Sequence, residues 1–224
     1  FPNAYPNTTI SLLAIEYGLD GPPLNFASGF NSSSVAIAAA CDYIREGKAD
    51  MIFAGGCEVL SEFAFYGLHA IGQLSPNDGG VECCAPFDQA ANGFVAGEGA
   101  AIFVLESEDH AKARNAPVHA QIGATVHRGG PVSGQEERAP HGSPEENPVL
   151  RAMQGAIHEG GVRTDQLDCI FAHANGEKST DEMEARAAAM DELQESGAFE
   201  DALSDEDEID RQLEAGRTES EVDA

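Results

Sequence analysis

The sequence predicts an α/β fold whose sheets are covered by helices on both faces. Two observations indicate this class. Apolar segments of strand length alternate along the chain with segments of helical periodicity. The strand-like segments are also continuous apolar runs, which is typical of strands that are buried on both faces of a sheet. From residue 191 to 224 large apolar residues become rare and acidic residues dense, so this part is expected to be a disordered acidic tail.

The first expected strand, residues 24–27, leads through small residues into a helix over residues 32–46. Apolar residues recur three and four positions apart along that helix, as they do on one face of an α-helix. Asn31 and Ser32 carry oxygen atoms that suit the cap of the helix, and Gly47 ends it. A residue at such a strand-to-helix bend faces the positive end of the helix dipole, where a thiolate or hydroxyl nucleophile is activated.

The remaining elements follow from the same two patterns. Apolar runs bounded by glycine or by charged residues predict strands, and helical spacing with a capping serine or a terminal glycine predicts helices. Strands are expected at residues 49–56, 100–105, 118–128 and 167–174. Helices are expected at residues 58–71, 107–115, 145–159 and 179–194. Loops rich in glycine and proline are expected at residues 74–80 and 129–144.

The charge balance excludes one class of partner. The 224 residues carry 39 acidic and 12 basic side chains, a formal net charge of −27. Nucleic acid and anionic membrane surfaces are poor partners for such a protein. One interpretation is a solvated surface that keeps the protein soluble. The other is a halophilic protein from a high-salt habitat, in which salt screens the repulsion between the acidic side chains.

Two further features favour a cytoplasmic protein. No apolar run reaches the roughly 18 residues that a membrane span needs, and no signal-peptide pattern opens the chain. The five cysteines are odd in number and fit no metal-binding spacing, so they are expected to be reduced and mostly buried, and no metal is expected. Cys41 and Cys169 lie in apolar segments and are predicted to belong to the core.

Four motifs in order resemble a known family. They read "YGLDGPPLNFASG", "GKADMIFAGGCE", "LSP" and "PFDQAANGFVAGEGAAIFVLE". Their order and spacing resemble the β-ketoacyl-acyl-carrier-protein synthases, condensing enzymes of the thiolase fold. The resemblance continues through "LDCIFAHANG" and "DEMEA" to about Ala189.

This resemblance implies a thiolase-like layered α-β-α-β-α sandwich that is built from two similar halves and is dimeric. This chain is expected to be a part of that fold, incomplete at both ends. Residues 1–99 would be the C-terminal part of the first half, residues 100–190 most of the second half, and residues 191–224 the acidic tail. The family's substrates are acyl and malonyl thioesters of acyl carrier protein, and no cofactor is implied.

The resemblance also places two substitutions at the positions of the family's catalytic residues. Phe30 stands where the family has its nucleophilic cysteine, and Asn175 stands where it has a histidine in an A-H-G-T pattern. No segment of this chain matches the later K-x-x-x-G-H pattern. A phenyl ring cannot hold an acyl group as a thioester, and an asparagine amide cannot exchange protons near neutral pH. The sequence therefore assigns no catalytic residue.

Several residues keep two interpretations. Phe30 is either a plug that fills a former acyl pocket or a core aromatic residue at a bend. His173 is either a displaced base or a histidine at the solvent edge; on a strand it would share a face with Asn175, roughly 6.6 Å away. Ser32 and the two serines after it are either nucleophiles or helix caps.

Three functions remain open. The first is a catalytically degenerate subunit like the chain-length factors of fatty-acid or polyketide synthesis. Such a subunit would pair with an active ketosynthase, in a heterodimer or homodimer, and would bind acyl carrier protein. The "FAHANGEKSTDEMEARA" segment resembles those subunits. The second is a divergent acyltransferase or decarboxylase that uses His173 or a serine. The third is a truncated homologue without function.

Overall fold

The computed structural model describes residues 7–76, 79–129 and 147–195. Contacts divide the chain into two units. The first comprises residues 1–72 and 96–127, and the second comprises residues 73–95 and 128–224. Each unit is described below by itself. The division predicted at residues 99 and 190 concerns the halves of the whole family fold and stays a prediction.

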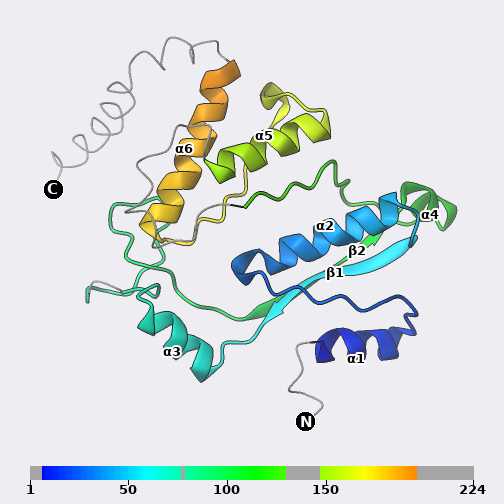
Figure 1. The fold of residues 1–224 in the computed structure, drawn as a ribbon, viewed down its shortest axis with the longest axis horizontal. Coiled ribbons are helices and arrows are strands. Elements are labelled where there is room, and N and C mark those ends of the chain that lie inside the picture. The colour runs from blue at the N-terminus through cyan, green and yellow to red at the C-terminus, as the bar shows by residue number, and fades with distance from the viewer. Residues whose placement is uncertain (1–6, 77–78, 130–146, 196–224) are drawn as a thin grey trace. The chain divides into compact units, whose positions relative to one another are not determined.

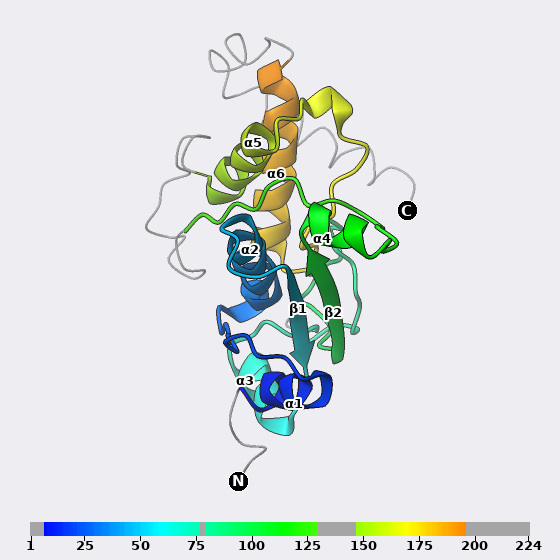
Figure 2. The ribbon, with the colours of Figure 1, turned by 90° about the vertical axis from the view of Figure 1, so that its right-hand side faces the viewer.

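The first unit is built around a pair of antiparallel strands. Strand β1 (Met51–Glu58) pairs along its full length with β2 (Gly99–Glu106). Helix α2 (Ser32–Arg45) packs along the pair and contacts mainly β1 (Figure 1). Figure 2 shows the two strands side by side, with α2 next to β1. On the opposite side the ring of Tyr17, from α1 (Thr8–Tyr17), meets the ring of Phe53 edge to face at 5.5 Å.

Two adjacent glycines in β1 allow this close packing. A Cβ atom at Gly55 would lie 2.1 Å from the carbonyl oxygen of Ala101 in β2. A Cβ atom at Gly56 would lie 2.0 Å from Oγ of Ser33 in α2. Real Cβ atoms do not approach other heavy atoms so closely. The Gly-Gly pair therefore sets how near β2 and the start of α2 can come to β1.

Most predicted helices are confirmed with small shifts at their ends. Helix α2 ends at Arg45, and Gly47 follows with φ +67°. The helix expected at residues 58–71 is α3 (Glu62–Ala70), and the one expected at 107–115 is α4 (Glu108–Ala113), whose predicted cap Ser107 accepts a hydrogen bond from His110 N at 3.3 Å. The predicted strands at 49–56 and 100–105 are β1 and β2.

Three predicted strands are wrong. The structure has no strand at residues 24–27, 118–128 or 167–174. A strand needs a neighbour that takes up its backbone N–H and C=O groups, and in the described residues only β1 and β2 offer each other a full ladder. The prediction that all strands are covered on both faces also fails for β2, because Ile102, Phe103 and Val104 are about half exposed.

The cysteines were predicted to be mostly buried, and this is wrong for four of them. Cys41 is buried in α2 as predicted, and burial raises the pKa of its thiol. Cys169 and Cys57 are exposed, because the apolar segment around Cys169 has no partner strand and Cys57 lies near the end of β1. Cys84 is exposed as well, and Cys83 is intermediate; all five thiols are free.

The second unit centres on two packed helices. Helix α5 (Pro148–Gly160) lies against α6 (Lys178–Glu195), as Figures 1 and 2 both show. The predictions of helices at 145–159 and 179–194 are thus confirmed. Leu150 of α5 is 1% exposed and Ala187 of α6 is fully buried. A short 3₁₀ helix, η5 (Thr164–Gln166), also contacts α6.

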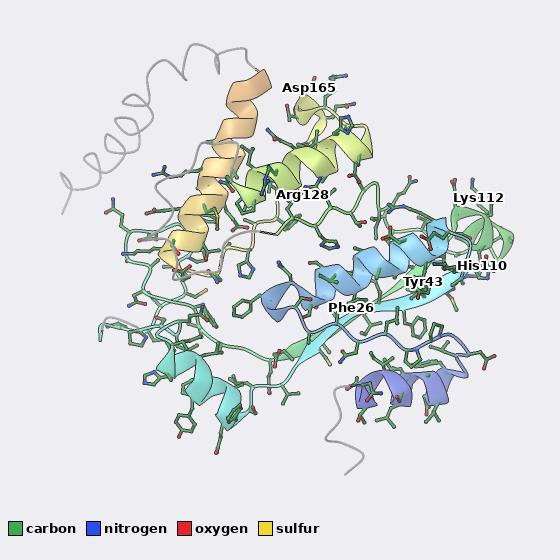
Figure 3. The ribbon with its side chains drawn as sticks, viewed as in Figure 1. Phe26, Tyr43, His110, Lys112, Arg128 and Asp165 are labelled. Atoms are coloured by element: carbon green, nitrogen blue, oxygen red, sulfur yellow. The ribbon has the colours of Figure 1, made fainter. Side chains whose placement is uncertain are left out.

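A cluster of charged side chains joins β2 to α4 in the first unit. Glu106 accepts hydrogen bonds from Arg114 Nε at 2.7 Å and from Arg114 Nη2 at 2.5 Å, and its Oε1 lies 2.8 Å from His110 Nδ1. Figure 3 labels His110 and Lys112 on α4, beyond the end of β2. The bidentate Arg114 contact, with that of His110, lowers the pKa of Glu106 to about 2.

This cluster predicts an acid-dependent loss of stability. Because the pKa of Glu106 is lower in the folded state than the ordinary 4.5, the cluster stabilises the fold above pH 4.5. That contribution falls as the pH drops through 4.5 toward about 2. Urea unfolding at a series of pH values should show a shallower loss in Arg114→Gln than in the unchanged chain. Equal slopes in the two chains would contradict the assignment.

The acidic composition predicts a dependence on salt. A net charge of −27 opposes the folded state by self-repulsion, and salt screens that repulsion over roughly 3 Å at 1 M. The temperature of unfolding should rise when KCl is increased from about 0.1 M to about 1 M. Sucrose at matched osmolality is the control, since it does not screen charge. An unfolding temperature independent of KCl would rule out the halophilic interpretation.

No helix among residues 7–76, 79–129 and 147–195 has the length and apolar character that crossing a bilayer requires.

Candidate functional site

The turn that carries Phe30 lies in the first unit, at the entrance to α2. A single 3₁₀ turn, η2 (Gly29–Asn31), leads directly into the helix. Oγ of Ser32 accepts a hydrogen bond from Ser28 N at 2.9 Å and donates one to Gly29 O at 2.7 Å. Gly29 has φ +66°, which favours glycine. Ser32 therefore braces the bend, which is a structural use of its hydroxyl.

The prediction that Asn31 caps α2 with its side chain is wrong. Asn31 occupies the cap position, but its side chain makes no capping hydrogen bond, and neither does Ser28 before η2. The N–H groups at the start of α2 thus receive no capping hydrogen bond from these two side chains, which keeps their positive potential at the bend.

Phe30 is displayed by this turn rather than packed beneath it. Its residue is 60% exposed, so the interpretation of Phe30 as a core aromatic of this unit is wrong. A phenyl ring offers no lone pair and no ionisable proton. The bend therefore presents an apolar surface at the place where a helix N-terminus would favour an anion or a nucleophile.

His173 and Asn175 lie in the second unit, just before α6. Glu184 of α6 accepts hydrogen bonds from the backbone N of His173 at 2.8 Å and of Ala174 at 3.0 Å. Ala174 has φ +47°, in the left-handed region. The expectation that His173 and Asn175 share one face of a strand is therefore wrong, because the chain turns sharply between them.

Asn175 serves the start of α6. Its Oδ1 accepts a hydrogen bond from Glu177 N at 2.9 Å. The Glu177 carboxylate in turn accepts from Ser179 Oγ, Thr180 Oγ1 and Thr180 N. Burial acts to raise the pKa of Glu177, but the hydrogen bonds from Thr180 and Ser179 outweigh it, and the pKa is lowered. The oxygen of Asn175 is thus committed to a turn that begins the helix.

Sequence reasoning missed a buried carboxylate beside this segment. Asp181 is 3% exposed, and its Oδ2 accepts a hydrogen bond from Phe87 N at 3.0 Å. Phe87 has φ +61°, so this bond holds a strained turn against α6. The signal was the aspartate that opens "DEMEA", the fourth residue of α6.

A second buried polar network lies in the same unit. Ser75 Oγ donates to Asn92 Oδ1 at 2.5 Å and accepts from Cys83 N at 3.0 Å. Asn92 Nδ2 donates to Val81 O at 3.2 Å, and the Cys83 thiol lies 3.4 Å from Asn92 Oδ1. Ser75 and Asn92 are both buried. The network fixes the loop after residue 74.

The predicted site residues thus fall into two groups. Phe30 and Ser32 belong to the first unit, and His173 and Asn175 belong to the second. Glu98 of the first unit is exposed and accepts a hydrogen bond from Leu60 N at 3.2 Å. Among the residues that the structure describes, no group of three or more His, Cys, Asp or Glu side chains could hold a metal ion.

Comparison with known proteins defines first the class of fold. The structure is similar to a β-ketoacyl synthase from Burkholderia phymatum STM815, with a TM-score of 0.68 and 33% identity, over 82% of this chain and 44% of that one. It is also similar to the ishigamide ketosynthase/chain length factor, with a TM-score of 0.56 and 28% identity, over 69% of this chain and 36% of that one. The fold is thus the thiolase-like fold of ketosynthases, represented in part.

The family follows from sequence. Residues 2–111 match the model of the β-ketoacyl synthase N-terminal domain. The chain is 32% identical over 188 residues to the 3-oxoacyl-[acyl-carrier-protein] synthase 2 of Coxiella burnetii. These residues cover 83% of this chain and 44% of that protein. This chain belongs to the β-ketoacyl synthase family. It spans less than half the length of the curated relatives that it matches.

Proposed function

We propose that this chain is a subunit for fatty-acid or polyketide synthesis that contributes shape to an acyl-binding site and carries no acyl group itself. The observation that supports this most is Phe30, which is exposed at the turn that leads into α2. The turn has a left-handed Gly29, the Ser32 brace and the helix N-terminus behind it. A phenyl ring stands where the resemblance to the family places the reactive thiol.

The chemistry of condensation explains why that replacement matters. The reaction needs a thiolate that attacks an acyl thioester and holds the chain while the malonyl unit loses CO₂. Phe30 cannot form this bond. A phenyl ring can instead contact an alkyl or polyene chain through its apolar faces. The proposed role is therefore to bind or limit the growing chain that a partner ketosynthase elongates.

Two comparisons support a ketosynthase subunit and acyl carrier protein as partners. The solved ishigamide structure pairs a ketosynthase with a chain length factor, and the Coxiella relative is named as a synthase that acts with acyl carrier protein. We propose the same kinds of partner here: a ketosynthase subunit and acyl carrier protein with its acyl or malonyl group. No cofactor is proposed.

Co-expression with an active ketosynthase subunit tests the proposal. A stable hetero-oligomer in light scattering, together with products whose chain length changes in Phe30→Ala, is the expected result. Tyr66→Ala, which removes an equally exposed aromatic ring from α3 of the same unit, is the matched control and should leave product length unchanged. Absence of association, or identical products with Phe30→Ala, would contradict the proposal.

A second function, malonyl-thioester decarboxylase, is favoured by the arrangement around His173. Asn175 uses its oxygen in the turn before α6, whereas the backbone of His173 is held by Glu184. The A-H dipeptide of the family pattern also occurs directly, as Ala172-His173. In this register His173, rather than Asn175, would stand at the position of the family's histidine. Its imidazole N–H would then donate a hydrogen bond to the thioester carbonyl oxygen.

In that reaction the bond between the carboxylate and the α-carbon breaks, CO₂ leaves, and the electron pair forms an enolate that solvent protonates. A hydrogen bond from His173 to the developing oxyanion would lower the barrier. No acyl-enzyme is needed, so Phe30 is no obstacle. Release of ¹⁴CO₂ from [3-¹⁴C]malonyl-acyl carrier protein that is lost in His173→Ala, but not in Asn175→Ala, would establish this function. Equal release with the unchanged chain and with His173→Ala would exclude it.

A further inference from the structure

The segment that presents His173 contains a strained residue. Ala174 has φ +47°, a conformation in which the Cβ atom of an L-residue crowds its own backbone. Glycine takes this conformation at no such cost, and Gly176 two residues later does so with φ +85°. A strained non-glycine residue persists only where the surrounding structure holds it.

Glu184 supplies the restraint. Its Oε1 accepts from His173 N at 2.8 Å and its Oε2 accepts from Ala174 N at 3.0 Å. One carboxylate thus takes two successive backbone N–H groups, which fixes the peptide plane between His173 and Ala174. Hydrogen bonds to a charged acceptor are stronger than those between neutral groups. The part of α6 that carries Glu184 is held to the start of α5, because the carbonyl of Met183 accepts a hydrogen bond from Asn147 Nδ2 at 3.3 Å.

We infer that Glu184 is a positioning residue: it holds Ala174 in the left-handed conformation and so fixes the direction in which His173 leaves the backbone. The inference rests on the proposed decarboxylase function only in giving His173 a role in that reaction. In the clamp the Glu184 carboxylate accepts from two backbone N–H groups, so its effect on a reaction would pass through the geometry of His173.

The test combines two substitutions in the full chain. Glu184→Gln leaves one carbonyl oxygen and so loses one of the two hydrogen bonds, and Glu184→Asp keeps the charge but shortens the reach. The matched control is Glu182→Gln, an exposed residue of the same helix that undergoes the same change of charge. The Cα and Cβ chemical shifts of Ala174, measured by NMR, report whether its backbone remains left-handed.

Both Glu184 variants should move Ala174 out of the left-handed region, whereas Glu182→Gln should not. If malonyl-thioester decarboxylation is present, Glu184→Gln should lower its kcat about tenfold or more with little change in KM. Adding Ala174→Gly should restore part of the lost rate, because glycine adopts the left-handed conformation without the steric cost that alanine has.

The outcomes distinguish a failure of the Glu184 clamp from a failure of the proposed decarboxylase function. A changed Ala174 conformation without decarboxylation in any chain leaves the clamp established and rejects the decarboxylase function. An unchanged Ala174 conformation in both Glu184 variants overturns the inference. So does a loss of activity that Ala174→Gly fails to restore, since Glu184 would then act otherwise than through this residue.

Discussion

Replacement of Phe30 by cysteine should turn the exposed bend into an acyl acceptor. The new thiol would stand at the N-terminus of α2, where Asn31 and Ser28 provide no side-chain capping bond and the helix dipole favours an anion. Its pKa should therefore lie below the usual value for cysteine. Incubation of Phe30→Cys with an acyl thioester should yield a covalent adduct on residue 30, detected by intact mass and peptide mapping.

The control for this prediction is Phe103→Cys. Phe103 is also aromatic and 56% exposed, but it lies within strand β2. A thiol there does not stand at a helix N-terminus, where the dipole acts. Iodoacetamide at neutral pH should alkylate residue 30 about threefold or more faster than residue 103, because a lower pKa raises the thiolate fraction more than it lowers the nucleophilicity of the thiolate. Equal rates would mean that the turn no longer activates a nucleophile.

The second large effect is expected at Gly55. A Cβ atom there would lie 2.1 Å from the backbone oxygen of Ala101, which cannot move without breaking the pairing of β1 with β2. Gly55→Ala should therefore lower the free energy of unfolding by about 3 kcal/mol or more, at or above the upper range for overpacked sites. Domains are stable by only about 5–15 kcal/mol, so the variant should unfold at markedly lower urea concentration.

Gly67→Ala provides the matched comparison. Gly67 lies inside α3, and a Cβ atom there would meet no atom within 4 Å. Alanine is the better helix former, so this variant should gain about 0.5–1 kcal/mol. Changes of opposite sign in the free energy of unfolding for the two variants are expected if β1 and β2 pack as closely as described. Similar small effects at both positions would show that β1 and β2 are not packed as described.

The helices were predictable because their signals are local. The start of α4 at Ser107 and the end of α2 near Gly47 depend on capping groups within one turn of the helix. The strands were not equally predictable, because a strand depends on a partner that can lie anywhere in the chain. Residues 167–174 have the apolar character of a strand, yet no described segment pairs with them along a ladder.

The candidate site, too, was predictable where its signals are local and not where they depend on distant partners. The resemblance to the family's motif places Phe30 at the position of the nucleophile, and this placement stays a prediction. The sequence does not reveal that Ser32 braces that bend or that Glu184 clamps Ala174, since both are hydrogen bonds to backbone atoms whose partners depend on the fold. The assumption of a strand at His173 failed for this reason: the left-handed turn at Ala174 has no signature in an alanine.

The central claim is that this chain contributes shape, with Phe30 exposed where its family places a nucleophile. Intact mass spectrometry of the unchanged chain, after incubation with acyl- and malonyl-acyl carrier protein, tests it most directly. The account predicts no added mass, even when a ketosynthase partner in the same mixture becomes acylated. An acyl group found on a serine or cysteine of this chain would contradict it.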